Sequence, residues 1–361
     1  MKNLITIFLI FILFFMLSCS KVDNVKSVEA DFVELIPFEL KIENGSVSEI
    51  TGRIGNEIYF LNKNGDAFSL NFLNMETDKI KSITIDSGKG PGELFMPMSM
   101  AYQDGKFYIY DMYLKRISIF NRDGSFEDLI NFKEEIGWPH SFDVFKDKFV
   151  FDGSLHNKIV LLNREGKIEK KIPYKEIQMM PKEGNDFRGG VIKCDDNFIY
   201  LGYYKSPFRI EKYNENLEKV DTISKNVNVK KINNLKWNMS MGFPAPVGTF
   251  IVSNIFVHDN LIYTNSVSGY DIIIKGKEKK YEPIYYDFYL NVFDKKDNKL
   301  KYQITSDRIE KCSGYEIINI NEDYIILFVR ENIIKYFDEN AEYTSGILVL
   351  KNPLSKLRGG L

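Results

Sequence analysis

Apolar and polar residues alternate in short runs along most of the chain, and turn residues separate the runs. The clearest example is the stretch from Asp86 to Phe132. Period-2 alternation bounded by Asp-Gly turns is typical of antiparallel hairpins, so this stretch predicts a β-meander. Its apolar runs contain Phe107 and Ile109, then Ile117 and Ile119, then Phe126, and its turns are Gln103-Asp104-Gly105 and Asn121-Arg122-Asp123-Gly124.

The same unit recurs along the chain. The residues that open the second strand of each copy align at Ile58, Phe107, Phe149, Phe198, Leu261 and Tyr324. Their separations are 49, 42, 49, 63 and 63 residues. Self-similar units of four short strands indicate a radial repeat, in which each unit packs only on its neighbours. The sequence therefore predicts an all-β, six-bladed β-propeller.

The two ends of the chain indicate how the ring closes. The sixth unit ends with the run Gly346–Lys351 and has one strand fewer than the others. Asp31–Ile42 is a spare strand at the other end, and its Pro37 suits an outer strand, whose far edge has no partner. We therefore expect the propeller to span residues 31–361 and to be closed by its N-terminal strand.

The N-terminal segment has the features of an export signal. Lys2 precedes an apolar run from Leu4 to Leu17, which is too short for a membrane span of about 20 residues but suits a signal peptide. Residues 1–18 resemble a bacterial lipoprotein signal, with Cys19 as the lipidated residue and the membrane as partner through that lipid. Met16 departs from the usual leucine, and an ordinary signal peptide is the alternative. Residues 19–30 are predicted to be a polar tether.

A glycine-rich loop at residues 88–93 is the most distinctive short motif. It contains Gly88, Gly90, Pro91, Gly92 and Glu93, with a lysine at position 89. Glycine-rich backbone can cradle a phosphate, but a P-loop needs Ser or Thr after its lysine and a helix behind it. Here a strand follows. The motif is therefore interpreted as an inter-blade crossover whose glycines permit a sharp turn.

Together, the glycine loop, the strand DGKFYIYD and the run SIFNRDG resemble the secreted six-bladed β-propeller lipoproteins of Bacteroidetes, relatives of NHL-repeat propellers. The resemblance is strongest over Gly88–Phe126. It implies a propeller exported to the bacterial cell envelope and lipid-anchored at the outer membrane, on its periplasmic or surface face. Members of this group have no general assigned activity, and most are associated with carbohydrate or peptide at the cell surface.

Composition narrows the chemistry. The 28 Phe and 21 Tyr suit stacked sheets, and a formal net charge of −2 gives no sign of a nucleic-acid partner. The three histidines are far apart and lack zinc-ligand spacing, so no metal or cofactor is expected. Cys194 and Cys312 are expected to be free, with a disulfide between them as the alternative.

The starts of the inner strands should ring one mouth of the central channel, and a small ligand would gather polar groups there. Aligned starts lie near Met98, His140, Arg188, Phe250 and Ser313. The candidate ligand-binding residues are Trp138, His140, Arg188 and Phe250. The pair Trp138 and His140 could stack on a sugar; alternatively, His140 only bonds to the next blade.

Two functional classes remain open at the level of sequence. The first is a non-catalytic binding module that presents one face of the propeller to a glycan, peptide or protein partner. The second is a lactonase-like hydrolase or lyase that holds calcium in its channel. Calcium takes six to eight oxygen ligands, and the inner-strand starts offer no carboxylate cluster. The sequence therefore favours binding, with no catalytic residue assigned.

Overall fold

The structure is a computed structural model that describes most of the chain. The described residues are 25–38, 50–137, 139–153, 157–174, 189–205, 207–224, 236–238, 245–247, 249–268, 270–275, 278–283, 289–306, 315–330 and 345–355. Strands make up most of this part, and turns and short loops join them. Within it, no helix has both the length and the apolar character needed to cross a bilayer.

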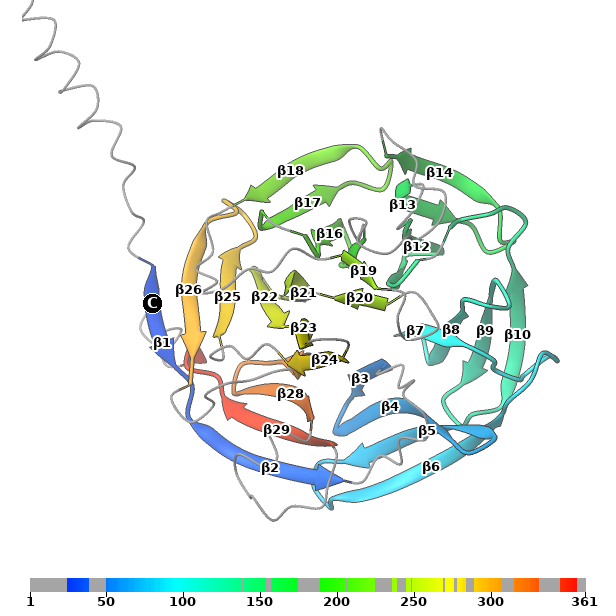
Figure 1. Ribbon diagram of the computed structural model, residues 1–361, viewed down its shortest axis with the longest axis horizontal. Coiled ribbons are helices and arrows are strands. Elements are labelled where there is room, and N and C mark those ends of the chain that lie inside the picture. Colours follow the sequence, from blue (N-terminus) through cyan, green and yellow to red (C-terminus); the bar gives the residue numbers. More distant parts are fainter. Residues whose placement is uncertain are drawn as a thin grey trace, which may run out of the picture.

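Six small sheets stand in a ring, each with its first strand toward the centre, as Figure 1 shows. The prediction of an all-β, six-bladed propeller is confirmed. Blade 1 is β3 (Ile50–Ile54), β4 (Glu57–Asn64), β5 (Ala67–Asn74) and β6 (Lys79–Asp86); blade 2 is β7 (Pro97–Gln103), β8 (Lys106–Asp111), β9 (Arg116–Asn121) and β10 (Phe126–Asn131); blade 3 is β11 (Phe142–Phe145), β12 (Lys148–Asp152), β13 (Asn157–Leu162) and β14 (Ile168–Pro173). Blade 4 is β15 (Gly190–Cys194), β16 (Ile199–Tyr203), β17 (Arg209–Tyr213) and β18 (Lys219–Ser224); blade 5 contains β21 (Thr249–His258), β22 (Leu261–Ser268), β25 (Tyr289–Asp294) and β26 (Leu300–Thr305); blade 6 contains β27 (Tyr315–Ile320), β28 (Tyr324–Arg330) and β29 (Ser345–Lys351).

Turn chemistry fixes the hairpins that the alternation predicted. In blade 2, Asp104 and Gly105 both have positive φ, at 52° and 81°. Two successive positive φ values define the tight turn whose twist matches the flanking strands. Gln103 therefore pairs directly with Lys106, and the register of β7 against β8 follows from the turn.

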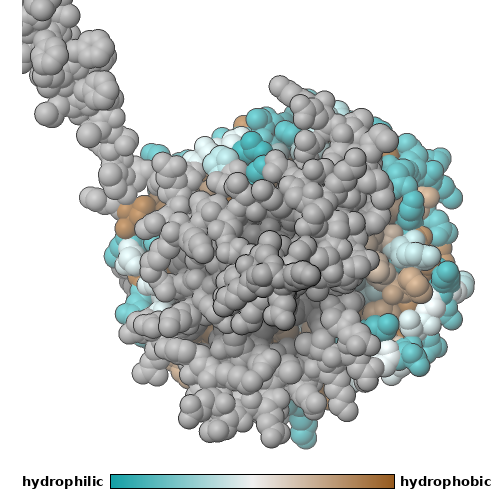
Figure 2. Space-filling view, in the orientation of Figure 1, coloured by the Kyte–Doolittle hydropathy of each residue, from teal (hydrophilic) through white to brown (hydrophobic). Residues whose placement is uncertain are grey.

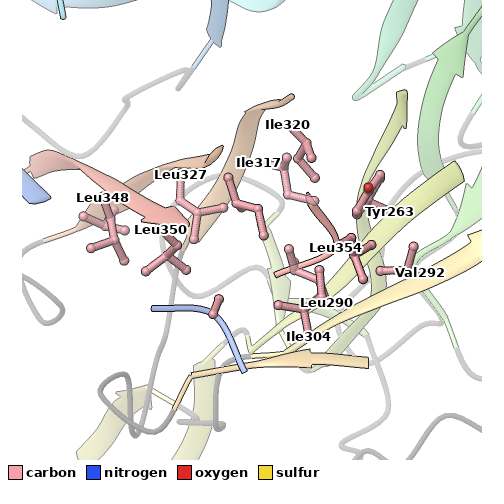
Figure 3. Packing of buried hydrophobic residues seen from close by; sticks show 13 residues of the cluster. Tyr263, Leu290, Val292, Ile304, Ile317, Ile320, Leu327, Leu348, Leu350 and Leu354 are labelled. Atoms are coloured by element: carbon pink, nitrogen blue, oxygen red, sulfur yellow. The ribbon is translucent and has the colours of Figure 1, made fainter. Parts of the chain in front are cut away.

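The core is divided among the blade interfaces. Six clusters of buried hydrophobic side chains lie between neighbouring sheets, one at each interface around the ring. Figure 3 shows the cluster between blades 5 and 6, where Leu290 and Val292 of β25 meet Leu327 of β28 and Leu348 of β29. Each blade packs on its two neighbours, which is how a chain of this length stays one domain.

The N-terminal segment closes the ring as predicted. β2 (Phe32–Phe38) pairs antiparallel with β29 and becomes the outer strand of blade 6. A bulge between Phe32 and Glu34 shifts the side chains from simple alternation. As a result Val33 is 44% exposed, while Ile36 is 7% exposed and packs at the interface of blades 6 and 1.

The predicted tether over residues 19–30 is wrong at its C-terminal end. β1 (Lys26–Glu29) pairs in parallel with β26 and adds a fifth strand to blade 5. Ala30 donates its N–H to the carbonyl of Thr305 over 2.8 Å and is 2% exposed. Three of the four residues of β1, namely Lys26, Ser27 and Glu29, are polar or charged, so the sequence shows no apolar alternation here. The strand is held mainly by its backbone ladder, and Val28 adds a half-buried contact with the core between blades 5 and 6.

Two further hairpins belong to none of the six blades. β19 (Lys236–Asn238) pairs with β20 (Ala245–Val247), and β23 (Tyr270–Lys275) pairs with β24 (Glu278–Pro283). In Figure 1 both hairpins lie over the centre of the ring, and β20 contacts β23. The two insertions of the chain therefore meet over one end of the central channel.

Candidate functional site

A cavity of about 320 Å³ lies at the centre of the ring, and the first strand of every blade contributes to its wall. This volume falls at the lower end of the usual range for small-molecule sites, roughly 300 to 1,000 Å³. Figure 2 shows the face seen in Figure 1; the described side chains visible there lie at the outer edge of the ring, where hydrophilic residues are interspersed with hydrophobic ones. The polar and aromatic lining residues are Arg53, Tyr59, Tyr102, Asp143, Lys193, Asn254, Phe256 and Asn319.

An ion pair joins blades 3 and 4 in this wall. Lys193 Nζ lies 3.2 Å from Asp143 Oδ2, and the backbone N–H of Cys194 donates to the same oxygen over 2.9 Å. The negative charge of Asp143 and burial act in opposite directions on Lys193, and the charge prevails, so the pKa of the lysine is raised. Lys193 therefore stays charged at neutral pH and forms an ion pair with Asp143 across the two blades.

A second charged group lies in the wall at blade 1. Arg53, at the end of β3, donates from Nε to the carbonyl of Gly55 over 2.6 Å. Its Nη1 donates to Asn319 Oδ1 of blade 6 over 3.3 Å. Burial lowers the pKa of Arg53. A guanidinium nevertheless stays protonated at neutral pH. The cavity thus holds a cation whose two hydrogen-bond acceptors are neutral.

Tyrosine rings form part of the wall between blades 1 and 2. The rings of Tyr59 and Tyr102 lie 6.0 Å apart between centroids. Gly52 makes room for the first of them, because a Cβ at this position would lie 2.1 Å from the Tyr59 hydroxyl oxygen. Burial, with the negative charge of Asp143 second, raises the pKa of Tyr59. The phenol is therefore a neutral hydrogen-bonding group.

Most of the residues predicted at the channel mouth lie outside the described part of the chain. Trp138 and Arg188 lie outside the described residues, as does the side chain of Phe250, whose backbone is in β21. His140 is described, directly before β11, and is not among the described lining residues. The described lining residues lie further along the inner strands than the aligned starts. Ligand binding by these four residues stays a prediction.

His140 belongs to a buried polar junction between blades 3 and 4. Its backbone N–H and that of Ser141 each donate to Asp152 Oδ1 over 2.7 Å. Asp152 Oδ2 accepts the N–H of Gly190, across the blade interface, over 3.4 Å. Burial raises the pKa of Asp152 to about 7, although the backbone donors act against it, and burial lowers the pKa of His140 to about 4.

These two shifts predict opposite pH dependences of stability. The pKa of His140 is lowered from 6.5, so its contribution is complete above pH 6.5 and is lost as the pH falls toward 4. A His140→Gln variant lacks this contribution. We expect the melting temperature of the wild type minus that of the variant to increase from pH 4 to pH 6.5. A difference that is constant over this range would contradict the assignment.

The glycine-rich loop connects β6 of blade 1 to β7 of blade 2, which makes it a crossover. Its own carboxylate occupies the position where an anion would bind: Glu93 Oε2 accepts the N–H of Gly90 over 2.6 Å. A Cβ on Gly88 would lie 2.0 Å from the same oxygen, and Gly92 has a positive φ of 77°. Pro91 lies within this turn. The geometry agrees with the crossover interpretation and with the rejection of a phosphate site.

Arg116, on β9, holds the loop from the other side. It is 5% exposed and donates to three loop carbonyls: from Nη1 to Lys89 over 3.1 Å, and from Nη2 to Gly90 and Glu93, each over 2.7 Å. Hydrogen bonds to a charged group contribute about 1.5 to 3 kcal/mol each before losses elsewhere are counted. A single side chain therefore fixes the crossover.

We expect Arg116→Ala to lower the free energy of unfolding by about 3 kcal/mol, because it removes three hydrogen bonds that a buried guanidinium donates to the loop. Chemical denaturation would measure it. The matched control is Arg122→Ala, whose side chain is 53% exposed and pairs with Glu57 across 2.7 Å. An exposed ion pair contributes about 0 to 1 kcal/mol. Equal effects of the two substitutions would contradict this role for Arg116.

Metal and thiol chemistry have few candidates in the described part of the chain. There, no group of three or more His, Cys, Asp or Glu side chains is arranged to hold a metal ion. Cys194 is a free thiol whose pKa is raised well above its usual value by burial. Cys312 and Cys19 lie outside the described residues.

Comparison with known proteins gives the fold. No protein-family model matches the sequence, and no curated protein is similar to it. Many solved structures are similar in three dimensions, and two of them serve as examples. One is a member of the DUF4221 family from Bacteroides vulgatus, with 14% identity, a TM-score of 0.56, and coverage of 91% of this chain and 98% of that one. The other, from Bacteroides fragilis, is described as a candidate exported protein, with 12% identity, a TM-score of 0.52, and coverage of 91% and 99%.

Proposed function

We propose that this protein is an exported, lipid-anchored propeller that binds a ligand in its central channel without converting it. The observation that carries the proposal is the cavity of about 320 Å³, to which the first strand of every blade contributes. A rigid ring that gathers polar side chains from several blades is suited to recognition, because the side chains are held in place before a ligand arrives.

The state of the carboxylate in the wall supports binding rather than catalysis. Asp143 accepts from Lys193 and from the N–H of Cys194, and its Oδ1 accepts the N–H of Val144 over 2.9 Å. These three donors take up most of the roughly four acceptor sites of the carboxylate. A general base needs an oxygen free for the proton that it removes. Asp143 is thus engaged in holding two blades together.

Export and anchoring rest on the N-terminal segment, with Cys19 as the lipidated residue. The solved propeller described as a candidate exported protein is consistent with this. Because β1 begins at Lys26, only six residues separate it from the anchor, and they span at most about 20 Å. Blade 5 would therefore stay close to the membrane. Mass spectrometry of the mature protein should find an acylated Cys19; an unmodified N-terminus at another residue would contradict anchoring.

A glycan and peptide array, probed with the domain that starts at Lys21, tests the binding function. An Asn319→Trp variant fills the channel, and Asn216→Trp makes the same change on an exposed turn. We expect the wild type and Asn216→Trp to bind the same array members and Asn319→Trp to lose them while keeping its melting temperature. If Asn319→Trp still binds the same array members, the binding site lies elsewhere. If the wild type binds neither glycans nor peptides, the proposal is contradicted.

A further inference from the structure

We propose that the ligand of the central channel is a saccharide that carries a carboxylate, and that Arg53 binds this carboxylate. The inference rests on the proposed function, since it assumes that the channel binds a ligand, and it adds the chemical class.

The first argument is the charge of Arg53. Its Nε and Nη1 donate to a backbone carbonyl and to an amide oxygen, both of them neutral. Among the residues that the structure describes, no carboxylate forms an ion pair with it. A half-buried charge without a counterion is costly, and a planar guanidinium offers five donors, of which these two bonds use two. A carboxylate fits the remaining donors in a bidentate arrangement.

The second argument is the neutralisation of the opposite wall. Asp143 is the one acidic side chain among the described lining residues, and Lys193 pairs with it across 3.2 Å. The pair contributes no net charge to the cavity. Arg53 therefore gives the described wall a net positive charge, which favours an anionic ligand and disfavours a cationic one.

The third argument concerns the rest of the ligand. Asn254 and Asn319 present amide groups that both donate and accept, and Tyr102 adds a phenol beside an aromatic face. Groups of this kind match hydroxyls, which also donate and accept, and aromatic faces pack on the apolar faces of sugar rings. A volume of about 320 Å³ suits a small molecule or the end of a chain. The combination indicates an acidic sugar rather than a fatty acid or a peptide strand.

The test uses oligosaccharides of galacturonic and glucuronic acid, each beside its carboxyl-reduced neutral counterpart, with binding measured by calorimetry. We expect the wild type to bind an acidic member at least ten times more tightly than its reduced form. Arg53→Gln should weaken acidic binding about 10- to 100-fold. Arg53→Lys, which keeps the charge, should weaken it less. Arg122→Gln removes an exposed arginine outside the channel and should leave binding unchanged.

The outcomes separate this inference from the proposed function. Equal binding of acidic and reduced forms that Asn319→Trp abolishes would overturn the carboxylate and keep the channel as a binding site. Peptide binding in the channel without saccharide binding would overturn the sugar and likewise keep the site. If no acidic saccharide binds, the inference is wrong, whatever else the array shows. A folded Arg53→Gln variant, checked by its melting temperature, that binds acidic sugars as the wild type does would also overturn it.

Discussion

Replacement of Asp152 by alanine is expected to lower the free energy of unfolding by about 3 to 5 kcal/mol. The carboxylate is 1% exposed and accepts two N–H groups at the entry to β11 and one from Gly190 of the next blade. Alanine would leave all three donors buried without an acceptor, and it would remove a bond that joins blades 3 and 4. This loss is a large share of the total stability of about 5 to 15 kcal/mol that is typical of a domain.

Two companion variants separate the hydrogen bonds from the charge. Asp152→Asn keeps an oxygen for the two short bonds at 2.7 Å but turns an N–H₂ group toward Gly190, so we expect a loss of about 1 to 2 kcal/mol. Asp147→Ala, at an exposed hairpin, should change stability by no more than about 0.5 kcal/mol. Urea denaturation measures all three. If Asp152→Ala and Asp147→Ala have equal effects, the junction does not contribute as argued.

The pH profile of the same variants gives an independent measurement. Burial raises the pKa of Asp152 from 3.8 to about 7, so the folded protein binds this proton more tightly than the unfolded chain does. The contribution of Asp152 is therefore greatest at low pH and falls as the pH rises from about 4 to about 7. The stability difference between the wild type and Asp152→Asn should shrink over this interval, opposite in sense to the difference for His140→Gln.

The architecture could be predicted from the sequence because it depends on features that recur. Each aligned opening, such as Phe107 or Phe149, lies in or beside the second strand of a blade. The side chains on these strands are buried at interfaces, so every unit carries the same apolar pattern. Asp-Gly turns add a second, local signal whose backbone angles the structure reproduces. Because the unit recurs six times, the apolar pattern and the turns could be recognised from the sequence alone.

The channel wall could not be predicted in the same way. Its residues come one or two at a time from strands far apart in sequence, such as Arg53 and Asn319, and no local motif links them. Alignment of the units located where each inner strand begins, whereas the cavity lies further along it. A charged residue near the end of an inner strand, as at Arg53 and Lys193, was the available signal. A charged residue at the end of a strand was also the available signal for the buried acids Asp111 and Asp152, each of which is the last residue of its strand.

β1 shows a different limit of sequence interpretation. Burial pattern identifies strands whose faces are covered, and the side chains of Lys26, Ser27 and Glu29 are exposed. What holds this strand is mainly the parallel backbone ladder to β26, with Val28 as its one side chain packed against the core. An outer strand added to a blade therefore resembles a polar linker in sequence. The distinction matters for any truncated form of the protein.

Removal of the N-terminal residues through Phe38 is expected to prevent the ring from closing. β2 bridges two interfaces: Ile36 packs between blades 6 and 1, while Phe32 and Leu35 pack toward blade 5. Loss of these side chains costs about 1.5 to 3 kcal/mol each, and the edge of β29 is left unpaired. Removal only through Ala30 deletes β1 and should be less harmful, but it should still lower the melting temperature, because the ladder to β26 and the buried Ala30 are lost.

Point substitutions on β2 test the closure without shortening the chain. Ile36→Ala should lower the free energy of unfolding by about 2 to 4 kcal/mol, since it opens a cavity at the interface where the last blade meets the first. Val33→Ala, on the same strand but 44% exposed, should cost no more than about 0.5 kcal/mol. Thermal and urea unfolding of these two variants and of the two truncated forms ranks the four proteins by stability. Val33 is the unpaired residue of the bulge, whereas Ile36 lies beyond the bulge and pairs with Ile347. Equal effects of the two substitutions would mean that β2 does not hold this register. A truncation through Phe38 that melts at the same temperature as the intact domain would mean that the ring closes without β2.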